Sequence, residues 1–326
     1  MGMDPALLRS QCLRTLERTE LNGMGRRIEG KVRDCYVRDG LRTLVTTDRV
    51  SAFDVIVGTL PFKGQVLNSI AAFWFEHTRE VAPNHLIAVP DPCVTVAHEC
   101  RPLPVEFVMR AYLTGVSPTS IWTAYERGER LYCGQRLPDG LHKHERLPDP
   151  LLTPTTKGER GQHDELSSRD DLVRSGVISE LHYDEAAGLA ARLFAEGERW
   201  SASRGLILVD TKYEMGLMPD GRIAVIDEMH TPDSSRYWYR HSYEEALRRG
   251  QDPPALDKEY VRRWLIERGY RGQGVPPPLP VEVRCEAARR YIEAFETLTG
   301  REFEPSLEDP IARIERNLRH FFDEKV

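Results

Sequence analysis

Charged residues interrupt two apolar segments past the middle of the chain, and their types suit phosphate and metal chemistry. The first segment carries Asp210, Lys212 and Glu214, and the second ends at Asp227 and Glu228. Carboxylate oxygens are good ligands for Mg²⁺ that is also held by substrate phosphates, and a lysine can pair with such phosphates as a mobile point charge. These residues therefore predict a site for a nucleotide and a metal ion.

The two segments are predicted to be β-strands that form a hairpin, because Asp220-Gly221 between them is a strong turn signal. Side chains alternate along a strand, so the three charged residues of the first strand share one face. A loop of two or four residues places Asp227 on that face too, directly opposite Glu214 in the two-residue case. A loop of odd length or a β-bulge would remove this agreement.

The alternative is a solvated hairpin with surface salt bridges, since antiparallel sheets often have a wet face. Two features favour the site. Residues 206–209 are a continuous apolar run, which indicates burial on both faces, and residues 231–236 are rich in donors and acceptors for an anionic ligand.

A second cluster, Gly30, Lys31 and Arg33, stands at the entry to another predicted hairpin, with strands at 31–37 and 41–47. The glycine would let the backbone approach a phosphate closely, and the two cations would share a strand face. A plain charged edge strand is the alternative, and neither a Walker P-loop nor a Rossmann glycine motif is present.

Two further clusters follow. Glu106 and Arg110 share one face of a strand predicted at 105–112, and a loop rich in serine and threonine comes after it. A buried arginine needs an anionic partner, so this strand and loop would hold a phosphate ester, unless it is a surface edge strand. Farther on, His163 is either a catalytic base, a metal ligand or a solvated hydrogen-bonding group.

The whole chain has 326 residues, which suggests about two domains, and a net charge of −6, which gives no reason to expect nucleic acid. No apolar run approaches the ~20 residues that span a bilayer, and we expect no membrane association and no signal peptide. The six scattered cysteines form no C-x-x-C pair, so we expect reduced thiols, no structural zinc and a cytoplasmic location.

Hairpins and helices occur in separate groups, which predicts an α+β fold. Helices are expected at 6–20, 69–80, from 121 to 128, in two stretches of 168–204, and at about 255–268 and 281–298. In the 168–204 region Ser167 and Asp184 are the predicted N-caps. Residues 131–162 form a long irregular connection, which is typical of a functional or disordered segment.

Six segments together resemble one family, the phosphoribosylaminoimidazole-succinocarboxamide synthases or SAICAR synthetases. They are GKVRD (30–34), TDRVSAFD (47–54), PVEFVMRAYLTG (104–115), LLTPTTKGERGQHDE (151–165), LVDTKYEMG (208–216) and IDEMHTPDSSRYW (226–238). The resemblance implies mostly antiparallel sheets with flanking helices in a two-domain architecture related to ATP-grasp, with ATP in a cleft between the domains. Residues 1–108 would form a nucleotide-covering domain. Residues 109–326 would carry the metal and ribotide sites and a helical region from about 245.

The resemblance also implies the reaction and the roles of the residues. ATP would drive ligation of L-aspartate to the carboxylate of 5-amino-1-(5-phospho-D-ribosyl)imidazole-4-carboxylate (CAIR), with an acyl phosphate as intermediate and SAICAR, ADP and phosphate as products. The ATP-binding residues would be Gly30, Lys31, Arg33, Glu106, Lys157 and Lys212, and Glu214 and Asp227 would hold Mg²⁺. The ribotide would be bound by Arg110, by Ser117 or Ser120, and by Asp210, Asp233, Ser235 and Arg236. Lys212, Lys157 and Asp164 would act in catalysis, Asp164 by orienting or deprotonating the incoming amine.

The competing hypotheses are a small-molecule kinase on a related ATP-binding scaffold and a nucleotide-binding regulatory protein. A kinase would use the same lysines and carboxylates with a hydroxyl acceptor. The expected partners are small-molecule substrates only, and the protein would be a monomer or a homodimer.

Overall fold

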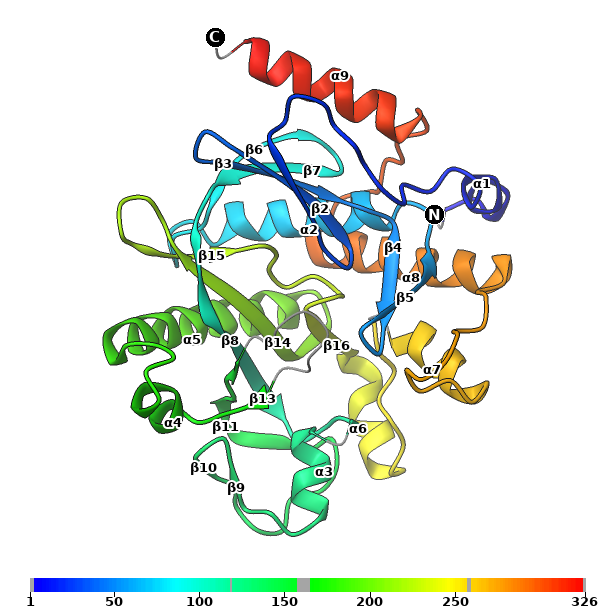
Figure 1. Ribbon diagram of the computed structural model, residues 1–326. Helices are drawn as coiled ribbons and strands as arrows, with labels where there is room; N and C mark the ends of the chain where they lie inside the picture. Colours follow the sequence, from blue (N-terminus) through cyan, green and yellow to red (C-terminus); the bar gives the residue numbers. More distant parts are fainter. Residues whose placement is uncertain (1–2, 118, 157–164, 257–258, 325–326) are drawn as a thin grey trace.

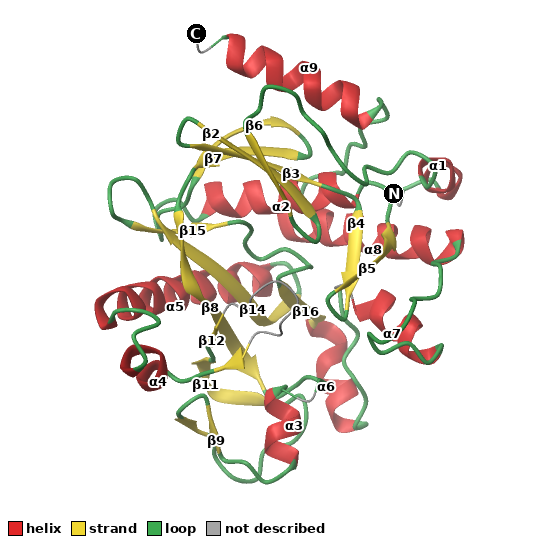
Figure 2. Cartoon of the chain, viewed as in Figure 1, coloured by secondary structure: helices red, strands yellow, loops and turns green. Residues whose placement is uncertain are grey.

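The computed structural model describes residues 3–117, 119–156, 165–256 and 259–324. Within these residues, strands form antiparallel sheets and helices pack on them (Figures 1 and 2). This agrees with the predicted α+β class.

A five-stranded sheet lies toward the N-terminus of the chain, with the strand order β1-β2-β3-β7-β6. Its strands are β1 (Arg26–Glu29), β2 (Arg33–Arg38), β3 (Leu41–Thr46), β6 (Leu86–Asp91) and β7 (Val94–His98). Helix α2 (Lys63–His77) lies along one side of the sheet and α9 (Pro310–Asp323) along the other (Figure 1). The buried side chains of Ile314 and Leu318 fix α9 to this sheet.

A seven-stranded sheet carries the charged strands, and its central pair is β8 (Arg101–Tyr112) and β14 (Leu206–Leu217). Its other strands are β11 (Arg146–Leu152), β12 (Thr155–Thr156), β13 (Glu165–Leu166), β15 (Ile223–Ile226) and β16 (Ser235–Tyr239). Strand β16 pairs with β14, and β11 pairs with β8. The long helix α5 (Glu180–Ser203) packs on β14 and β8.

The remaining elements are hairpins and helices outside the two large sheets. Two hairpins stand apart from the large sheets, β4–β5 (Arg49–Ala52 and Val55–Thr59) and β9–β10 (Leu131–Tyr132 and Gln135–Arg136). The other helices are α1 (Pro5–Gln11), α3 (Ile121–Glu126), α4 (Arg169–Arg174), α6 (Arg240–Arg248), α7 (Glu259–Glu267) and α8 (Val281–Thr299).

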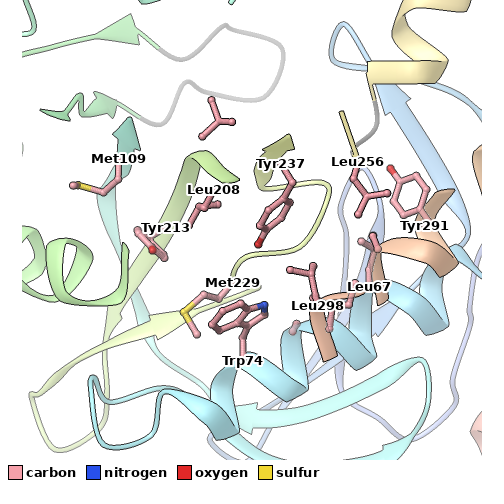
Figure 3. Close-up of a cluster of buried hydrophobic side chains, with 14 of the residues drawn as sticks. Leu67, Trp74, Met109, Leu208, Tyr213, Met229, Tyr237, Leu256, Tyr291 and Leu298 are labelled. Carbon is pink, nitrogen blue, oxygen red and sulfur yellow. The ribbon is translucent and has the colours of Figure 1, made fainter. Parts of the chain in front are cut away.

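One large hydrophobic core joins the seven-stranded sheet to α2 and α8. In Figure 3, Trp74 of α2 lies between Met229 and Leu298, and Tyr237 of β16 faces the same space. All four side chains are nearly inaccessible to solvent. Burial of large aromatic and aliphatic groups stabilises a fold in proportion to the apolar area removed from water. The segment after β15 is therefore held in place, because Met229 within it and Tyr237 just after it are both buried in this core.

Several predicted element bounds were wrong, and tertiary contacts explain them. Helix α1 ends at Gln11 rather than at 20, because the following backbone bonds buried carboxylates instead of continuing a helix. The N–H of Leu16 donates to Asp48 at 2.8 Å, and that of Thr19 donates to Asp34 at 2.7 Å.

The predicted helix caps were also wrong. Ser168, not Ser167, caps α4, and Ser179 caps α5 five residues before Asp184. Asp184 lies inside α5 and pairs with Arg169 at 2.7 Å. Helix α2 begins six residues before its predicted start at 69, and α6 and α9 had not been predicted.

The division of the chain after residue 108 stays a proposal, and β8 continues across that position. All six cysteines are free thiols. Over the stretches that the structure describes, no helix is long and apolar enough to cross a membrane.

Candidate active site

The candidate site is built on the face that β8 and β14 share. Register places Glu106 opposite Glu214, Val108 opposite Lys212, and Arg110 opposite Asp210. The predicted faces of both strands are therefore confirmed, and the two faces are one surface. Two charged clusters lie on it: Lys212 of one and Asp210 of the other are two residues apart along β14, or about 7 Å at the usual rise of ~3.4 Å per residue.

The first cluster has Lys212 between two carboxylates. Its Nζ lies 2.6 Å from Oε1 of Glu106 and 3.1 Å from Oε1 of Glu214. Like charges directly opposite on neighbouring strands repel, so the lysine compensates a pair that would otherwise destabilise the sheet. Burial opposes the charge of Lys212, but Glu214 and Glu106 outweigh it and hold the pKa of the lysine above its ordinary value. The side chain of Lys212 is 36% exposed to solvent, so a ligand can reach it.

Asp227 and Glu228 also belong to this charged region, but the predicted register of the hairpin does not account for their positions. The observed register pairs Glu214 with Ile226 and Leu217 with Ile223, so the loop has an odd number of residues. The even loop on which the predicted position of Asp227 depended is therefore not observed. Strand β15 ends at Ile226 and Asp227 has φ 69°, so the alternation of the strand no longer sets the direction of its side chain.

Arg33 binds both acidic residues after β15. Its guanidinium lies 2.9 Å from Asp227 and 2.6 Å from Glu228, and the arginine side chain is 10% exposed. Desolvation raises the pKa of Asp227 to about 6, with Arg33 acting against the rise and Glu214 adding to it. Asp227 thus interacts electrostatically with Glu214 and with Lys212. The five-stranded sheet, through Arg33, thus contacts the charged face of the seven-stranded sheet.

The structure separates Lys31 from Arg33, contrary to the prediction that they share a strand face. Lys31 lies in the turn between β1 and β2, which the Gly30 N–H closes by donating to the Arg33 carbonyl at 2.8 Å. A Cβ on Gly30 would stand 3.1 Å from that carbonyl oxygen, so the turn favours glycine. Lys31 pairs instead with Asp54 at 2.5 Å, where both side chains are 58% exposed.

The second cluster is an aspartate held by two arginines. Oδ2 of Asp210 lies 3.2 Å from Arg110 and 3.3 Å from Arg236, which stand on the two strands that flank β14. Thr153 accepts a further bond from Nε of Arg110 at 3.0 Å. These two guanidinium groups contact the same carboxylate oxygen, and each presents planar donors suited to a phosphate.

The predicted serines differ in their surroundings. Ser120 caps α3, accepting from Thr123 N, and a Cβ on Gly115 would lie 2.5 Å from the Cβ of Ser120. Ser117 contacts Thr119 at 3.5 Å. Ser235 bonds Thr211 at 2.7 Å, and both residues alternate to the face of β14 and β16 opposite Asp210. Its role in binding the ribotide stays a prediction.

Asp233 is held by two buried groups. Nζ of Lys63, at the start of α2, lies 2.8 Å from Oδ2, and the hydroxyl of Tyr291 in α8 donates to Oδ1 at 2.5 Å. The side chain of Lys63 is fully buried. Sequence reasoning missed Lys63, Tyr291 and the pairing of Glu228, because no local pattern marks a lysine or tyrosine that meets a carboxylate far along the chain. Lys157, His163 and Asp164 lie outside the described residues.

The donors at the first cluster fit Mg²⁺ only in part. Among the described residues, no three His, Cys, Asp or Glu side chains are grouped so as to hold a metal ion by themselves. Two hard carboxylate donors, Glu214 and Asp227, do suit an ion that completes its shell with water and phosphate oxygens.

Comparison with known proteins gives one consistent result. Residues 26–278 match the family model described as SAICAR synthetase. The phosphoribosylaminoimidazole-succinocarboxamide synthase of Legionella pneumophila is 45% identical over 301 residues, which cover 91% of this chain and 96% of the relative.

Solved structures have the same fold. The SAICAR synthase of Saccharomyces cerevisiae in complex with SAICAR matches with a TM-score of 0.77 and 30% identity, covering 89% of this chain and 99% of the yeast chain. A SAICAR synthetase in complex with ADP matches with a TM-score of 0.65 and 20% identity, covering 86% of this chain and all of the other.

Proposed function

The chain belongs to the SAICAR synthetase family, and we propose that it uses ATP to ligate L-aspartate to the carboxylate of CAIR, as a step of purine biosynthesis. The yeast relative is named as a complex with SAICAR, the product of this reaction, and another relative as a complex with ADP. We also propose that the protein is cytoplasmic and that it is either a monomer or a homodimer.

The single observation that best supports this function is the pair of charged clusters on one sheet face. The Lys212 cluster offers a cation and carboxylates for a triphosphate and its metal ion. The Arg110–Asp210–Arg236 cluster offers two guanidinium groups for a phosphate monoester. A ribotide with its phosphate at the arginines would extend its imidazole carboxylate along β14 toward Lys212, where the γ-phosphoryl group would lie.

The chemistry follows from this arrangement. A carboxylate does not react with an amine at neutral pH, so it must first be activated. An oxygen of the CAIR carboxylate attacks the γ-phosphorus of ATP, ADP leaves, and an acyl phosphate forms. The amine of aspartate then attacks the acyl carbon, phosphate leaves with the bridging oxygen, and the nitrogen gives up a proton. Lys212 would neutralise charge on the transferred phosphoryl group, a step governed mainly by positioning and electrostatics.

Mg²⁺, when bound, would neutralise the β- and γ-phosphates of ATP. Glu214 and Asp227 are the residues that we propose to hold it, while Arg33 orients Asp227 through their 2.9 Å ion pair. Asp164, Lys157 and the ATP roles of Gly30, Lys31 and Glu106 stay within the proposal on the strength of the family resemblance.

The test is to incubate the purified full-length protein with ATP, Mg²⁺, CAIR and L-aspartate, and to measure ADP and SAICAR together. We expect equal amounts of both products, formed only when all components are present. Release of ADP with a hydroxylated acceptor, and none with CAIR plus aspartate, would identify a kinase instead. Binding of ATP with no turnover in either case would identify a regulatory protein.

A further inference from the structure

Residues 131–162 were predicted to be a long irregular connection, but β9, β10, β11 and β12 lie within them. His144 stands between β10 and β11 and is buried beside the loop that carries Ser117 and Ser120. Its Nδ1 lies 2.9 Å from the hydroxyl of Thr114, at the start of that loop, and its Nε2 lies 2.8 Å from Oδ1 of Asp252. The imidazole is 9% exposed. The connection thus contributes a residue to the serine loop.

Backbone contacts fix His144 as firmly as its ring does. Its N–H donates to the carbonyl of Leu113 at 2.7 Å, and its own carbonyl accepts from the hydroxyl of Tyr243 at 2.8 Å. Its φ is 68°, a conformation that costs energy for a side chain other than glycine. The imidazole is therefore held at one position against the serine loop.

The three side chains Asp252, His144 and Thr114 form a chain of hydrogen bonds with a defined direction. A carboxylate only accepts, so Nε2–H of His144 donates to Asp252 and leaves Nδ1 of the neutral ring to accept from the Thr114 hydroxyl. Burial lowers the pKa of His144, with Asp252 opposing that effect, which favours the neutral ring. Thr114 is itself 3% exposed, so its hydroxyl is no nucleophile for substrate and acts as an anchor for the loop.

Aromatic contacts lead from the same ring to the strands that carry the arginine cluster. His144 contacts Trp238 edge-on, with ring centroids 5.4 Å apart, and Trp238 contacts Tyr112 at 5.2 Å. Trp238 lies two residues after Arg236 in β16, and Tyr112 two residues after Arg110 in β8, so each shares a face with its arginine. Tyr112 and Trp238 therefore connect His144 to the two strands that carry the arginines which hold Asp210.

We propose that His144 is a positioning residue for the ribotide phosphate: anchored by Asp252, it fixes Thr114 and sets the serine loop against Arg110 and Arg236, so that loop and arginines bind the 5′-phosphate together. This inference rests on the proposed function. It assigns to the 131–162 connection a part in substrate affinity that its irregular sequence does not reveal.

The test compares Thr114→Val, which keeps the shape and removes the hydroxyl, and Asp252→Asn, which removes the charge that orients the ring. A third variant, His144→Gln, removes the ring itself. Asp139→Asn serves as a matched control, since Asp139 belongs to the same connection and its side chain is 89% exposed. For each protein we would measure KM for CAIR, KM for ATP, kcat, and the inhibition constant of the CAIR riboside, which lacks the phosphate.

Loss of the buried hydrogen bond between Thr114 and His144 should raise KM for CAIR about tenfold in Thr114→Val and in His144→Gln. Loss of the charge that orients the ring should raise the same constant in Asp252→Asn. KM for ATP, kcat and the inhibition constant of the riboside should stay within about threefold, as should all four constants in the control. A structural role alone would weaken CAIR and the riboside equally, and that result would overturn the inference, as would an unchanged KM for CAIR. If His144→Gln does not fold, the other two variants decide. An inactive wild-type protein would instead refute the proposed function.

Discussion

Replacement of Lys212 by methionine tests the charged face most directly, because it keeps the length of the side chain and removes the cation. Two hydrogen bonds to carboxylates would be lost, at 2.6 Å and 3.1 Å. Such bonds contribute ~1.5–3 kcal/mol each when buried, but exposed ion pairs contribute only ~0–1 kcal/mol. Since the lysine side chain is 36% exposed, we discount the pair of bonds to about 1.5 kcal/mol in total.

The variant also leaves Glu106 directly opposite Glu214 with no cation between them. Cross-strand repulsion of this kind costs ~0.2–1 kcal/mol, so we expect the free energy of unfolding to fall by about 2 kcal/mol. At ~2.1 cal/mol/K of unfolding entropy per residue, a chain of 326 residues should lose about 3 °C in Tm. Turnover should fall at least about a hundredfold, as it does when a charge-stabilising donor is removed elsewhere.

The assay combines scanning calorimetry with SAICAR formation in saturating substrates. Arg289→Met is the matched control, since Arg289 is 47% exposed and also pairs with two carboxylates, Glu286 at 2.8 Å and Glu293 at 3.0 Å, but on helix α8 instead of the charged face. It should lose less than ~1 kcal/mol and keep its turnover. In the double variant Glu106→Gln/Lys212→Met the lost stability should largely return while turnover stays low. Near-normal turnover of Lys212→Met, or no recovery of stability in the double variant, would refute this account of the cluster.

Three other predictions concern separate parts of the molecule. Arg236→Ala should raise KM for CAIR about tenfold or more and KM for ATP far less; steady-state kinetics with each substrate varied would reveal the opposite ranking if Arg236 serves the nucleotide. Glu214→Ala and Asp227→Ala should each abolish Mg²⁺-dependent turnover while circular dichroism stays native, and normal rates in either would remove that residue from the metal site. Burial, with Arg42 and Arg33 nearby, lowers the pKa of His85 to about 3, so only the unfolded chain takes up its proton as pH falls below about 6.5. Stability should therefore decline below that pH by up to ~1.4 kcal/mol per pH unit, and urea unfolding at pH 7.5 and 5.0 should show a smaller decline in His85→Leu; equal declines would contradict this.

The sequence predicted the charged face well where strand periodicity controls it. Asp210, Lys212 and Glu214 lie on one face of β14, and Glu106 and Arg110 lie on the adjoining face of β8, as alternation requires. The activity was predicted from the family segments and from their order along the chain. Periodicity could not predict that these two strands pair with each other, because they are separated by about a hundred residues in the sequence.

The failures occur where the chain leaves regular structure. The odd loop after Leu217 would have turned Asp227 away from the site if the strand had continued, but the positive φ of Asp227 brings it back. An aspartate whose backbone adopts the left-handed conformation has no strong local signature in a single sequence. In the same way, the turn at Gly30 separates Lys31 from Arg33, so one cation meets Asp54 and the other meets Asp227.

The bond from Tyr291 to Asp233 bears on how this protein can be shortened. The family model ends at residue 278, yet Tyr291 stands in α8 and donates to a carboxylate that also holds the fully buried Lys63. A fragment cut at the end of the family match would open this ion pair to water and remove the hydroxyl donor of Tyr291. Expression trials or gene fusions that treat the last helices as a dispensable tail should therefore yield a protein with a loosened loop before Arg236. The smallest functional part of the ligase should therefore include α8.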